Sequence, residues 1–600
     1  MNIPKRIEKL RNLMSEKQID VYLVPSDDNH QSEYVGDHFK SRAFITGFTG
    51  SAGTAFIAKD TAGLFTDGRY FVQAGKQLKG SGVELFKMFE PGVPTLEEHL
   101  YNIIPENGTL GFDGRVISMN LGKRLADSLS KKGVSLKTDS DLIDAVWEER
   151  PPLSKEPVFF LEEKYSGEST VSKLARVREA MQKKGADYHV IAALDDVNWL
   201  INLRGNDIAY FPLILSYAVV TMDEMYLYID ECKLSDAIRA ELLKANIKLR
   251  PYDAIYDDVT TLEAGKKVLI DPDRINYELY NLLSKNMIII EGENPTVLMK
   301  SMKNQTELDN FKIAQIKDSV ALTRFMKWIK DSFSDSTSYP DVTELSACDK
   351  LEEFRKRQKD YIRQSFDPIM AYGENAALPH YAPSKEADAK VVPGNFLLAD
   401  TGGGYMQGST DITRTFVVGE VSDIMKKHFT LVMLGNLHLS DVVFYDGMYG
   451  FELDLFARQA LMKNGLDFNH GTGHGIGYLM SVHEHAASIR FYRKGAEDGT
   501  PFRLGMIVSN EPGLYLEGEY GIRLENDIFV KLRQKLPNRD LYEFENMTFV
   551  PFDLDAVDPS IMTDVDKALL NKYHKEVYEK LSPYLTEEEN VWLAKYTREI

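Results

Sequence analysis

Five residues in the second half of the chain have the types and positions that metal chemistry needs. Asp400 closes the apolar run FLLA, and Asp411 follows a GGGY turn on what we expect to be a returning strand. His474 lies in HGTGHGIG, Glu511 follows the apolar run MIVSN, and Glu525 lies in GIRLEN. An acidic residue that closes a buried strand is costly unless a cation or a donor meets it. These strand ends are therefore candidate ligand positions.

Four carboxylates and one imidazole form an oxygen-rich ligand set. Such a set suits Mn²⁺, Mg²⁺, Co²⁺ or Fe²⁺ better than a thiolate-type structural zinc site. Four bare negative charges would repel one another, and two divalent cations would neutralise them. Two metals roughly 3.5–4 Å apart can share one water and lower its pKa towards neutrality. The alternative is scattered surface acids plus a core histidine, which fits each residue taken singly but not the five together.

Two neighbours of these residues share their expected orientation. Arg523 and Glu525 have the same strand parity, so they face one side while Ile522 and Leu524 face the core. His470 precedes His474 by four positions, the spacing of a helical zinc pair, but the glycines between them disfavour a helix. In extended backbone the even spacing also places both on one face.

The elements that must position these side chains begin near Lys303. Thr306 and Glu307 predict a helix start, and helical apolar spacing follows them. A glycine- and strand-rich stretch extends from about 365 to 552. The tail from Asp564 is predicted to be helical again.

The first half of the chain contains two segments that resemble each other. Met14 matches Met181 and Asp20 matches Asp187, at a constant offset of 167 positions. In each segment an amphipathic helix leads into an apolar strand. Residues 149–157, ERPPLSKEP, contain three prolines and predict a linker between them. We predict two copies of one α/β module; the alternative is chance, since helix-then-strand is a common pattern.

Composition limits the classes of function. The chain has 600 residues and a formal net charge of −20, which argues against a nucleic-acid partner. Cys232 and Cys348 form no CxxC pair, so neither a disulfide scaffold nor a thiolate zinc site is expected. Free thiols fit a reducing compartment. No apolar run approaches the ~18 residues of a membrane helix, and the N-terminus does not have a signal-peptide pattern. We expect a cytoplasmic protein without a membrane partner.

Six motifs together carry a family resemblance: LPHYAP, LADTGGGYMQGSTDITRTF, HGTGHGIG, SVHEH, SNEPGLY and GIRLEN. They resemble the peptidases of the methionine aminopeptidase, prolidase and aminopeptidase P superfamily, which have a pita-bread catalytic domain. SRAFITGFTGSAGTAF, TDGRYFVQAG and NWLINLRGNDIAYFPLILSYA extend the resemblance to the three-domain, cytosolic type of Xaa-Pro aminopeptidase, in peptidase family M24B.

The resemblance implies an α/β (α+β) fold class, with two creatinase-N-terminal-like α/β modules followed by a C-terminal pita-bread catalytic domain. We place creatinase-like domain I at residues 1–150 and its duplicate, domain II, at 151–302. The metallopeptidase domain, with its helical tail, is placed at 303–600. The resemblance further implies a homodimer.

Carried over position by position, the resemblance implies two divalent ions per chain, usually Mn²⁺ in aminopeptidase P. Asp400 is then expected on one ion, and His474 with Glu511 on the other. Asp411 and Glu525 are expected to bridge both ions. All five ligand types are present in this sequence.

The same carry-over implies the catalytic residues His380, His470, His483 and Glu511. His380, His470 and His483, with Arg523, are expected to bind the substrate. The implied reaction releases the N-terminal residue from peptides with proline in second position, by attack of a hydroxide bridging the two metals. One departure from the family is His485, where a glycine often follows the HE pair, so the pocket rim is expected to differ.

Three alternatives stay open. A prolidase-type Xaa-Pro dipeptidase would have identical ligands, but the duplicated module and helical tail favour an aminopeptidase P. A methionine aminopeptidase needs no such N-terminal half. A catalytically inactive pita-bread binding module would typically have lost ligands. A zincin is disfavoured because HExxH is absent: His483 and Glu484 are followed by His485, Ala486 and Ala487.

Overall fold

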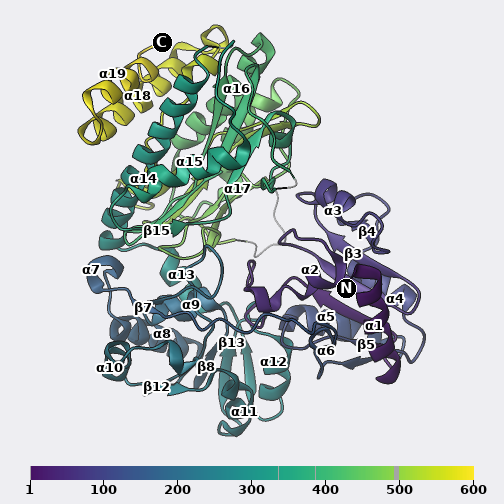
Figure 1. Ribbon diagram of the computed structural model, residues 1–600. Helices are drawn as coiled ribbons and strands as arrows, with labels where there is room; N and C mark the ends of the chain where they lie inside the picture. The colour runs from purple at the N-terminus through teal and green to yellow at the C-terminus, as the bar shows by residue number, and fades with distance from the viewer. Residues whose placement is uncertain (1, 336, 386, 492–498) are drawn as a thin grey trace. The chain divides into compact units, whose positions relative to one another are not determined.

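The computed structural model describes residues 2–335, 337–385, 387–491 and 499–600. The chain forms two compact units. The N-terminal unit comprises Met1–Glu162 and Glu168–Thr296, and the C-terminal unit comprises Glu163–Gly167 and Val297–Ile600. Figure 1 colours the first in purple to blue-teal and the second in teal to yellow.

The N-terminal unit contains two six-stranded sheets of the same design. Their strand orders are β4-β3-β2-β1-β5-β6 and β12-β11-β10-β8-β13-β14. In both sheets the same successive pairs are parallel or antiparallel. The first sheet consists of Val21–Pro25, Thr54–Ala58, Ala62–Thr66, Glu84–Lys87, Thr109–Gly111 and Ser135–Lys137, β1 to β6. The second consists of β8 (Tyr188–Ile191), β10 (Tyr217–Val220), β11 (Met225–Tyr228), β12 (Ile247–Arg250), β13 (Lys267–Ile270) and β14 (Ile288–Glu291). The predicted pair of like α/β modules is confirmed.

Equivalent helices precede the central strand of each sheet. Helix α1 (Ile3–Glu16) precedes β1, and α8 (Thr170–Lys184) precedes β8. Each begins at a capping side chain, and each buries one of the matched methionines, Met14 and Met181. The match between Met14 and Met181 in the sequence therefore corresponds to the same core position in both modules.

The segment predicted as a linker contains no helix or strand from residue 149 to 157. The remaining short strands of this unit, β7 (Phe159–Phe160) and β9 (Leu203–Arg204), pair with each other. Cys232 and Cys348 are both free, as expected. Among the described residues, no helix combines the length and apolar character that crossing a bilayer requires. The domain boundaries at 150 and 302 stay predictions.

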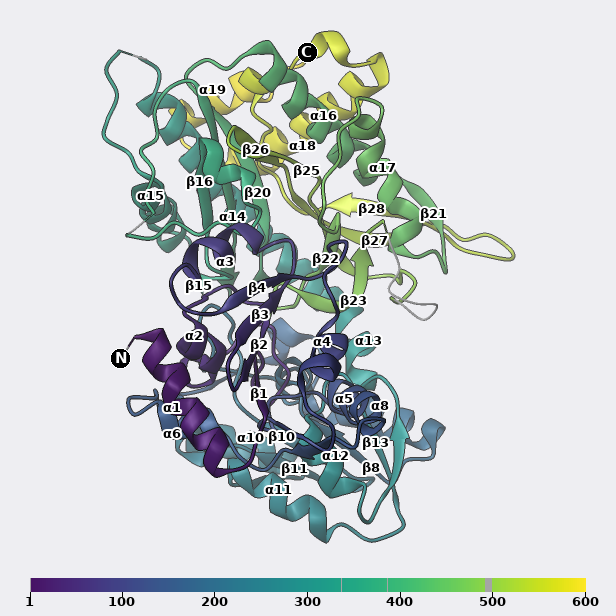
Figure 2. The ribbon, with the colours of Figure 1, turned by 90° about the vertical axis from the view of Figure 1, so that its right-hand side faces the viewer.

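The described residues of the C-terminal unit form four sheets; Figure 2 shows their arrangement. The largest has the order β21-β28-β27-β24-β22-β23, with strands Val443–Tyr445, Leu541–Asn546, Asn526–Gln534, Ile507–Asn510, Gly473–Gly475 and Glu484–Ile489. The sheet β16-β17-β20 consists of Ile369–Tyr372, Asn395–Thr401 and Ile412–Val418. Two smaller sheets are β15-β18-β19 (Tyr361–Gln364, Gly403–Tyr405, Gly408–Ser409) and β25-β26 (Gly513–Leu516, Tyr520–Arg523).

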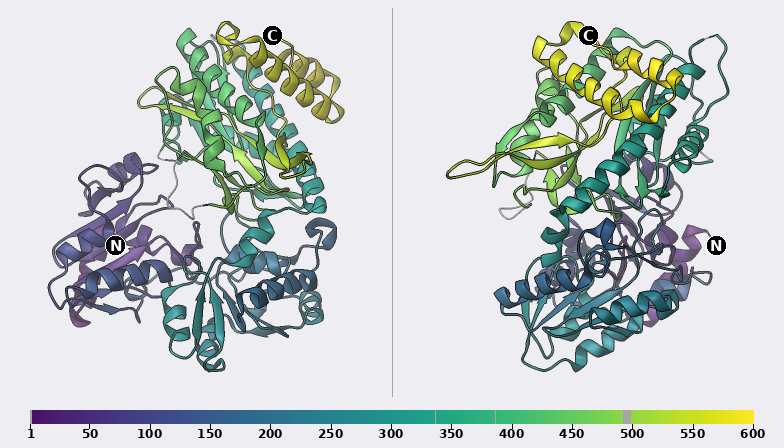
Figure 3. Two further views of the ribbon diagram at one scale, coloured as in Figure 1. Left: turned by 180° about the vertical axis from the view of Figure 1, so that it is seen from behind. Right: turned by 90° about the vertical axis from the view of Figure 1, so that its left-hand side faces the viewer.

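Helices cover these sheets. Helix α14 (Gln305–Ser332) is capped by Asn304 with Glu307, two positions earlier than the predicted start at Thr306, because the Asn304 side chain accepts the Glu307 N–H. Helix α15 (Glu344–Lys356) packs on α14, and α16 (Asp423–Ser440) packs on α17 (Gly450–Met462). The predicted helical tail forms α18 (Asp564–Leu581) and α19 (Glu587–Tyr596), which lie beside α14 (Figure 3).

Candidate metal centre

Two of the candidate carboxylates lie at the joined ends of one strand pair. Asp400 is the penultimate residue of β17, and Asp411 directly precedes β20. The strands pair antiparallel, with Asp400 opposite Thr413. The turn between them returns so tightly that a Cβ on Gly402 would lie 2.0 Å from the Thr410 carbonyl oxygen. Glycine at 402 therefore allows the close approach that brings the two aspartates to one edge.

Asp411, His474 and Glu525 form a cluster that could hold a metal ion. One ligand atom from each lies within 4.8 Å of the others. The His474 Nδ1 lies 3.0 Å from the Gly475 carbonyl oxygen and 3.1 Å from that of Val482. Because a carbonyl only accepts, Nδ1 carries the proton and Nε2 presents its lone pair. That Nε2 lies 3.5 Å from Asp411 Oδ2.

Glu511 joins this cluster from β24. Its Oε1 lies 3.5 Å from His474 Nε2 and accepts a 3.1 Å hydrogen bond from the Ser509 hydroxyl. The same hydroxyl accepts the His474 backbone N–H at 3.0 Å. Gly473 permits this contact, since a Cβ there would lie 1.9 Å from the Ser509 carbonyl oxygen. The Ser509 hydroxyl therefore holds both the backbone of His474 and the carboxylate of Glu511.

Thr413 of β20 holds Glu525 in position through two hydrogen bonds. The Glu525 Oε2 accepts a 2.6 Å hydrogen bond from the Thr413 hydroxyl, and the Glu525 backbone N–H donates to the Thr413 carbonyl. Sequence parity placed Arg523 and Glu525 on one strand. In the structure the strand breaks between them: Arg523 ends β26, and β27 begins at Asn526 in another sheet.

Two site residues were missed by sequence reasoning. Asp527 is buried, and its Oδ2 accepts the Asp411 N–H at 3.2 Å and a hydrogen bond from Gln315. The Tyr515 hydroxyl accepts a 2.7 Å hydrogen bond from Arg523 and lies 2.8 Å from His470 Nε2. The available signals were the acid two positions after Glu525 and the tyrosine in the SNEPGLY motif.

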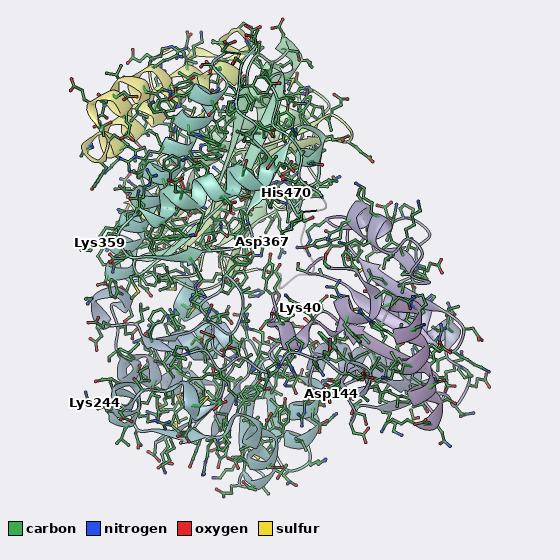
Figure 4. The ribbon with its side chains drawn as sticks, viewed as in Figure 1. Lys40, Asp144, Lys244, Lys359, Asp367 and His470 are labelled. Carbon is green, nitrogen blue, oxygen red and sulfur yellow. The ribbon has the colours of Figure 1, made fainter. Side chains whose placement is uncertain are left out.

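Arg523 links the carboxylates to the histidines. It donates to Asp400 Oδ2 at 2.6 Å and to the Pro379 carbonyl at 3.3 Å, next to His380. His470, labelled in Figure 4, is half-buried. Its Nδ1 lies 2.7 Å from the Gly471 carbonyl oxygen. Nδ1 is thus the donor and Nε2 accepts from Tyr515. Burial, reinforced by Arg523, lowers the pKa of His470 to about 3, so this imidazole is neutral.

The third predicted histidine faces the ligand cluster. The ring centroid of His483 lies 4.4 Å from that of His474, with the rings near perpendicular. The next residue, Glu484, turns inward and forms a buried ion pair with Lys303 at 2.5 Å. His485 is exposed, and Ala486 has a φ of +87°. The departure from the family pattern therefore falls on an exposed residue beside an unusual backbone conformation.

The electrostatics of the cluster fit divalent cations. Burial, together with the charge of the neighbouring acids, raises the pKa values of Asp411 and Glu525 well above the usual range. Burial raises the pKa of Glu511 to about 7, although Arg523 opposes this. Asp527 adds one carboxylate and Arg523 cancels it, so four net negative charges remain when all five acids are ionised. Such a buried excess of oxygen ligands is what two divalent ions would neutralise.

Four family profiles match the chain in succession. Residues 6–146 and 149–307 match creatinase/prolidase N-terminal domains. Residues 309–531 match metallopeptidase family M24, and 540–600 match the C-terminal region of that family. All five candidate ligands lie within the M24 match.

Curated relatives cover nearly the whole chain. A probable Xaa-Pro aminopeptidase P from Laccaria bicolor is 39% identical and spans 98% of this chain and 91% of the relative. Xaa-Pro aminopeptidase 1 from Dictyostelium discoideum is 37% identical, with 98% and 94% covered.

Solved structures agree with these sequence relatives. The X-prolyl aminopeptidase from Caenorhabditis elegans, described as a cytosolic enzyme with a di-nuclear active site, superposes with a TM-score of 0.94 at 32% identity, covering 100% of both chains. A Xaa-Pro dipeptidase from Bacillus anthracis matches only 64% of this chain, though 99% of its own, at 24% identity and a TM-score of 0.52. The chain belongs to metallopeptidase family M24, among the aminopeptidase P proteins with two creatinase-type N-terminal domains.

Proposed function

We propose that this protein is a metal-dependent aminopeptidase that releases the N-terminal residue from peptides with proline in second position. The observation that carries the proposal is the full-length likeness to the Caenorhabditis elegans X-prolyl aminopeptidase, at 100% coverage of both chains. The cluster of Asp411, His474 and Glu525 supplies the metal-binding donors that such an enzyme needs.

We assign two divalent ions, Mn²⁺ by the resemblance, to five residues. Asp411 and Glu525 would be shared between the ions, Asp400 would serve one, and His474 with Glu511 the other. Two observations support this assignment. Ligand atoms of Asp411, His474 and Glu525 lie close together, with Glu511 3.5 Å from His474 Nε2, and the cluster has the net negative charge described above. Two divalent ions at this site would polarise the scissile carbonyl and acidify a water molecule.

The protein's own acid–base group is Glu511. The Ser509 hydrogen bond orients its carboxylate, which would take a proton from the attacking water and deliver it to the proline nitrogen. That nitrogen must gain a proton for the amine to leave. The Xaa-Pro bond itself lacks an N–H, so a peptidase that grips its substrate as a β-strand loses a donor there.

Histidines and Arg523 would bind the substrate. His483 would donate to the developing oxyanion. His380 would position the substrate or pass on the proton, and His470 would contact the substrate near its proline. Arg523 holds Asp400 in place through the 2.6 Å hydrogen bond and extends the polar surface to Tyr515.

Peptide length separates this activity from an Xaa-Pro dipeptidase. Mn²⁺-supplemented hydrolysis should be measured on Xaa-Pro-Yaa tripeptides beside Xaa-Pro dipeptides. We expect the tripeptides to release their first residue and the dipeptides to be poor substrates. Exclusive cleavage of dipeptides would overturn the aminopeptidase assignment in favour of a dipeptidase.

We further propose a cytoplasmic location and a homodimer. The Caenorhabditis elegans neighbour is described as a cytosolic enzyme, which supports the first. The homodimer stays a prediction from the family resemblance, and sedimentation of the purified protein would test it. The net charge of −20 supports the absence of a nucleic-acid partner.

A further inference from the structure

Helix α14 buries polar side chains behind the candidate metal centre. Gln315, Asp318 and Ser319 are each 0% exposed, three and four positions apart on one helix face. Asp318 forms a bidentate ion pair with Arg355 of α15: Nε donates to Oδ1 at 2.7 Å and Nη2 to Oδ2 at 2.9 Å. Neither residue is among the five candidate ligands.

This ion pair is bonded to both ends of the turn that carries the two aspartates. Arg355 Nη2 donates to the Thr401 hydroxyl at 3.0 Å, and Thr401 directly follows Asp400. The Thr410 hydroxyl donates to Asp318 Oδ2 at 2.8 Å, and Thr410 directly precedes Asp411. One buried ion pair is therefore hydrogen-bonded to the side chain of the residue beside each aspartate.

The Asp318 carboxylate has no spare bonding capacity. Its Oδ1 accepts from Arg355 and from the Tyr405 hydroxyl at 2.9 Å, and its Oδ2 accepts from Arg355 and Thr410. Four donors fill the four lone pairs of the two oxygens. A fully satisfied buried network admits one arrangement, because any shift leaves a buried polar group unpaired.

A contribution to folding stability does not explain why the chain has this buried ion pair. Apolar side chains of similar volume often replace a buried ion pair at no cost, because both charges must be desolvated. A buried network that permits a single geometry is useful where the distance between two metal ligands must be fixed. The segment it fixes is the one whose ends carry Asp400 and Asp411.

We propose that the Asp318–Arg355 pair positions Asp400 and Asp411 so that two divalent ions bind as a close pair. The inference rests on the proposed metal centre. The pair acts through Thr401 and Thr410, and it would contact neither the ions nor the substrate.

The test removes, one at a time, the two hydroxyls that join the pair to the turn. Thr410→Val keeps the side-chain shape and removes the hydroxyl, which bonds Asp318 and also accepts the Gly403 N–H at 2.8 Å, whereas Thr410→Ser keeps it. Thr401→Val removes the hydroxyl that accepts from Arg355 Nη2.

Thr430→Val is the matched control. Thr430 of α16 is also 0% exposed; its hydroxyl donates to the Lys426 carbonyl and accepts the Asp558 N–H, and neither partner is one of the five candidate ligands.

Each metal-free protein is titrated with Mn²⁺ alone, and electron paramagnetic resonance reports whether two bound ions are magnetically coupled. We expect two coupled ions in the parent. Thr410→Val should weaken binding of at least one ion by about 10- to 100-fold and reduce the coupled signal. Thr410→Ser and Thr430→Val should retain parent-like affinity and coupling. Thr401→Val should weaken Mn²⁺ binding in the same way, and it also serves if Thr410→Val does not fold. Parent-like binding in Thr401→Val would assign a loss in Thr410→Val to the Gly403 bond and overturn the positioning role.

Parent-like Mn²⁺ affinity and coupling in Thr410→Val would overturn the positioning role while leaving the metal centre intact. Equal losses in Thr430→Val would also overturn it, since they would reflect general destabilisation. A parent that binds no Mn²⁺ would overturn the proposed metal centre itself. The parent titration therefore separates the two failures.

Discussion

Two groups of buried acids, one in each unit of the chain, have different partners. In the N-terminal unit, Asp207 is paired with Lys233 at 2.5 Å, and Asp196 lies 3.2 Å from Arg274. In the C-terminal unit Asp318 is likewise paired with Arg355, but among the described carboxylates around Asp411 a guanidinium forms an ion pair with Asp400 alone, that of Arg523.

An external cation is required where buried acids have no base of their own. A buried acid with its own base is already neutralised, and it needs nothing further from solution. In the cluster around Asp411, burial and the neighbouring acids raise the pKa values of Asp411 and Glu525; the Arg523 guanidinium pairs with Asp400 and neutralises one of the charges. Because both groups of acids belong to one chain, matched substitutions in each can be compared under the same conditions.

Asp411→Asn should have the largest effect on metal content. Asp411 is proposed to serve both ions, so its replacement should lower Mn²⁺ affinity at both sites by about 100-fold or more, and activity with it. Elemental analysis after dialysis measures this. Two tightly held ions per chain in the variant would refute the shared role.

His380→Ala and His483→Ala should separate catalysis from metal binding. Both histidines are proposed to act on the substrate, so metal content should stay near that of the parent. Turnover should fall by about 10²- to 10⁴-fold, mainly in kcat if the contact strengthens in the transition state. Loss of a metal in either variant, or parent-like turnover in both, would show a wrong assignment.

The stability of the metal-free protein should respond with opposite signs in the two units. Asp207→Asn leaves Lys233 buried without its ion-pair partner and should cost about 3–5 kcal/mol of unfolding free energy. Asp411→Asn relieves repulsion and should stabilise the metal-free protein by about 1 kcal/mol. Urea unfolding in the presence of a chelator compares them. The comparison between units fails if Asp411→Asn destabilises the protein as much as Asp207→Asn does.

The free energy of unfolding should fall at acid pH through one buried histidine in each unit. Burial lowers the pKa of His189 to about 4 and that of His574 to about 3, one histidine in each unit. Both must be neutral when folded, so the unfolded state binds more protons below its pKa near 6.5. Stability is then full above that pH and is lost as pH falls towards the folded-state values, by roughly 2 kcal/mol per histidine at pH 5. His189→Gln should remove its share in pH-dependent urea unfolding; an unchanged pH slope would count against it.

Sequence reasoning identified the five candidate ligands because short local signals mark them. Asp400 and Glu511 follow apolar strands, and Asp411 and His474 lie beside glycines that the tight turns need. The two modules could be predicted because the matched methionines, Met14 and Met181, occupy equivalent core positions. These signals all lie within a few residues of the feature they predict.

The parts that could not be predicted depend on contacts between distant segments. Asp318 and Arg355 are 37 positions apart on two helices, and nothing local marks either as part of the centre. Strand parity also cannot reveal that the chain changes sheets after Arg523, since a continuous strand and a broken one have the same alternation. Asp527 was missed for the same reason, because its role appears only when the Asp411 N–H is brought to it.

The number of Mn²⁺ ions bound by the parent protein shows whether the buried carboxylates form a metal site. The claim is that the excess of buried carboxylates around Asp411, His474 and Glu525 is a two-ion site. Equilibrium dialysis of metal-free protein against Mn²⁺, with the bound metal counted per chain, gives the answer in one experiment. We expect two ions per chain in the parent and the loss of both in Asp411→Asn. No bound ion in the folded parent, or binding that Asp411→Asn leaves unchanged, would contradict it.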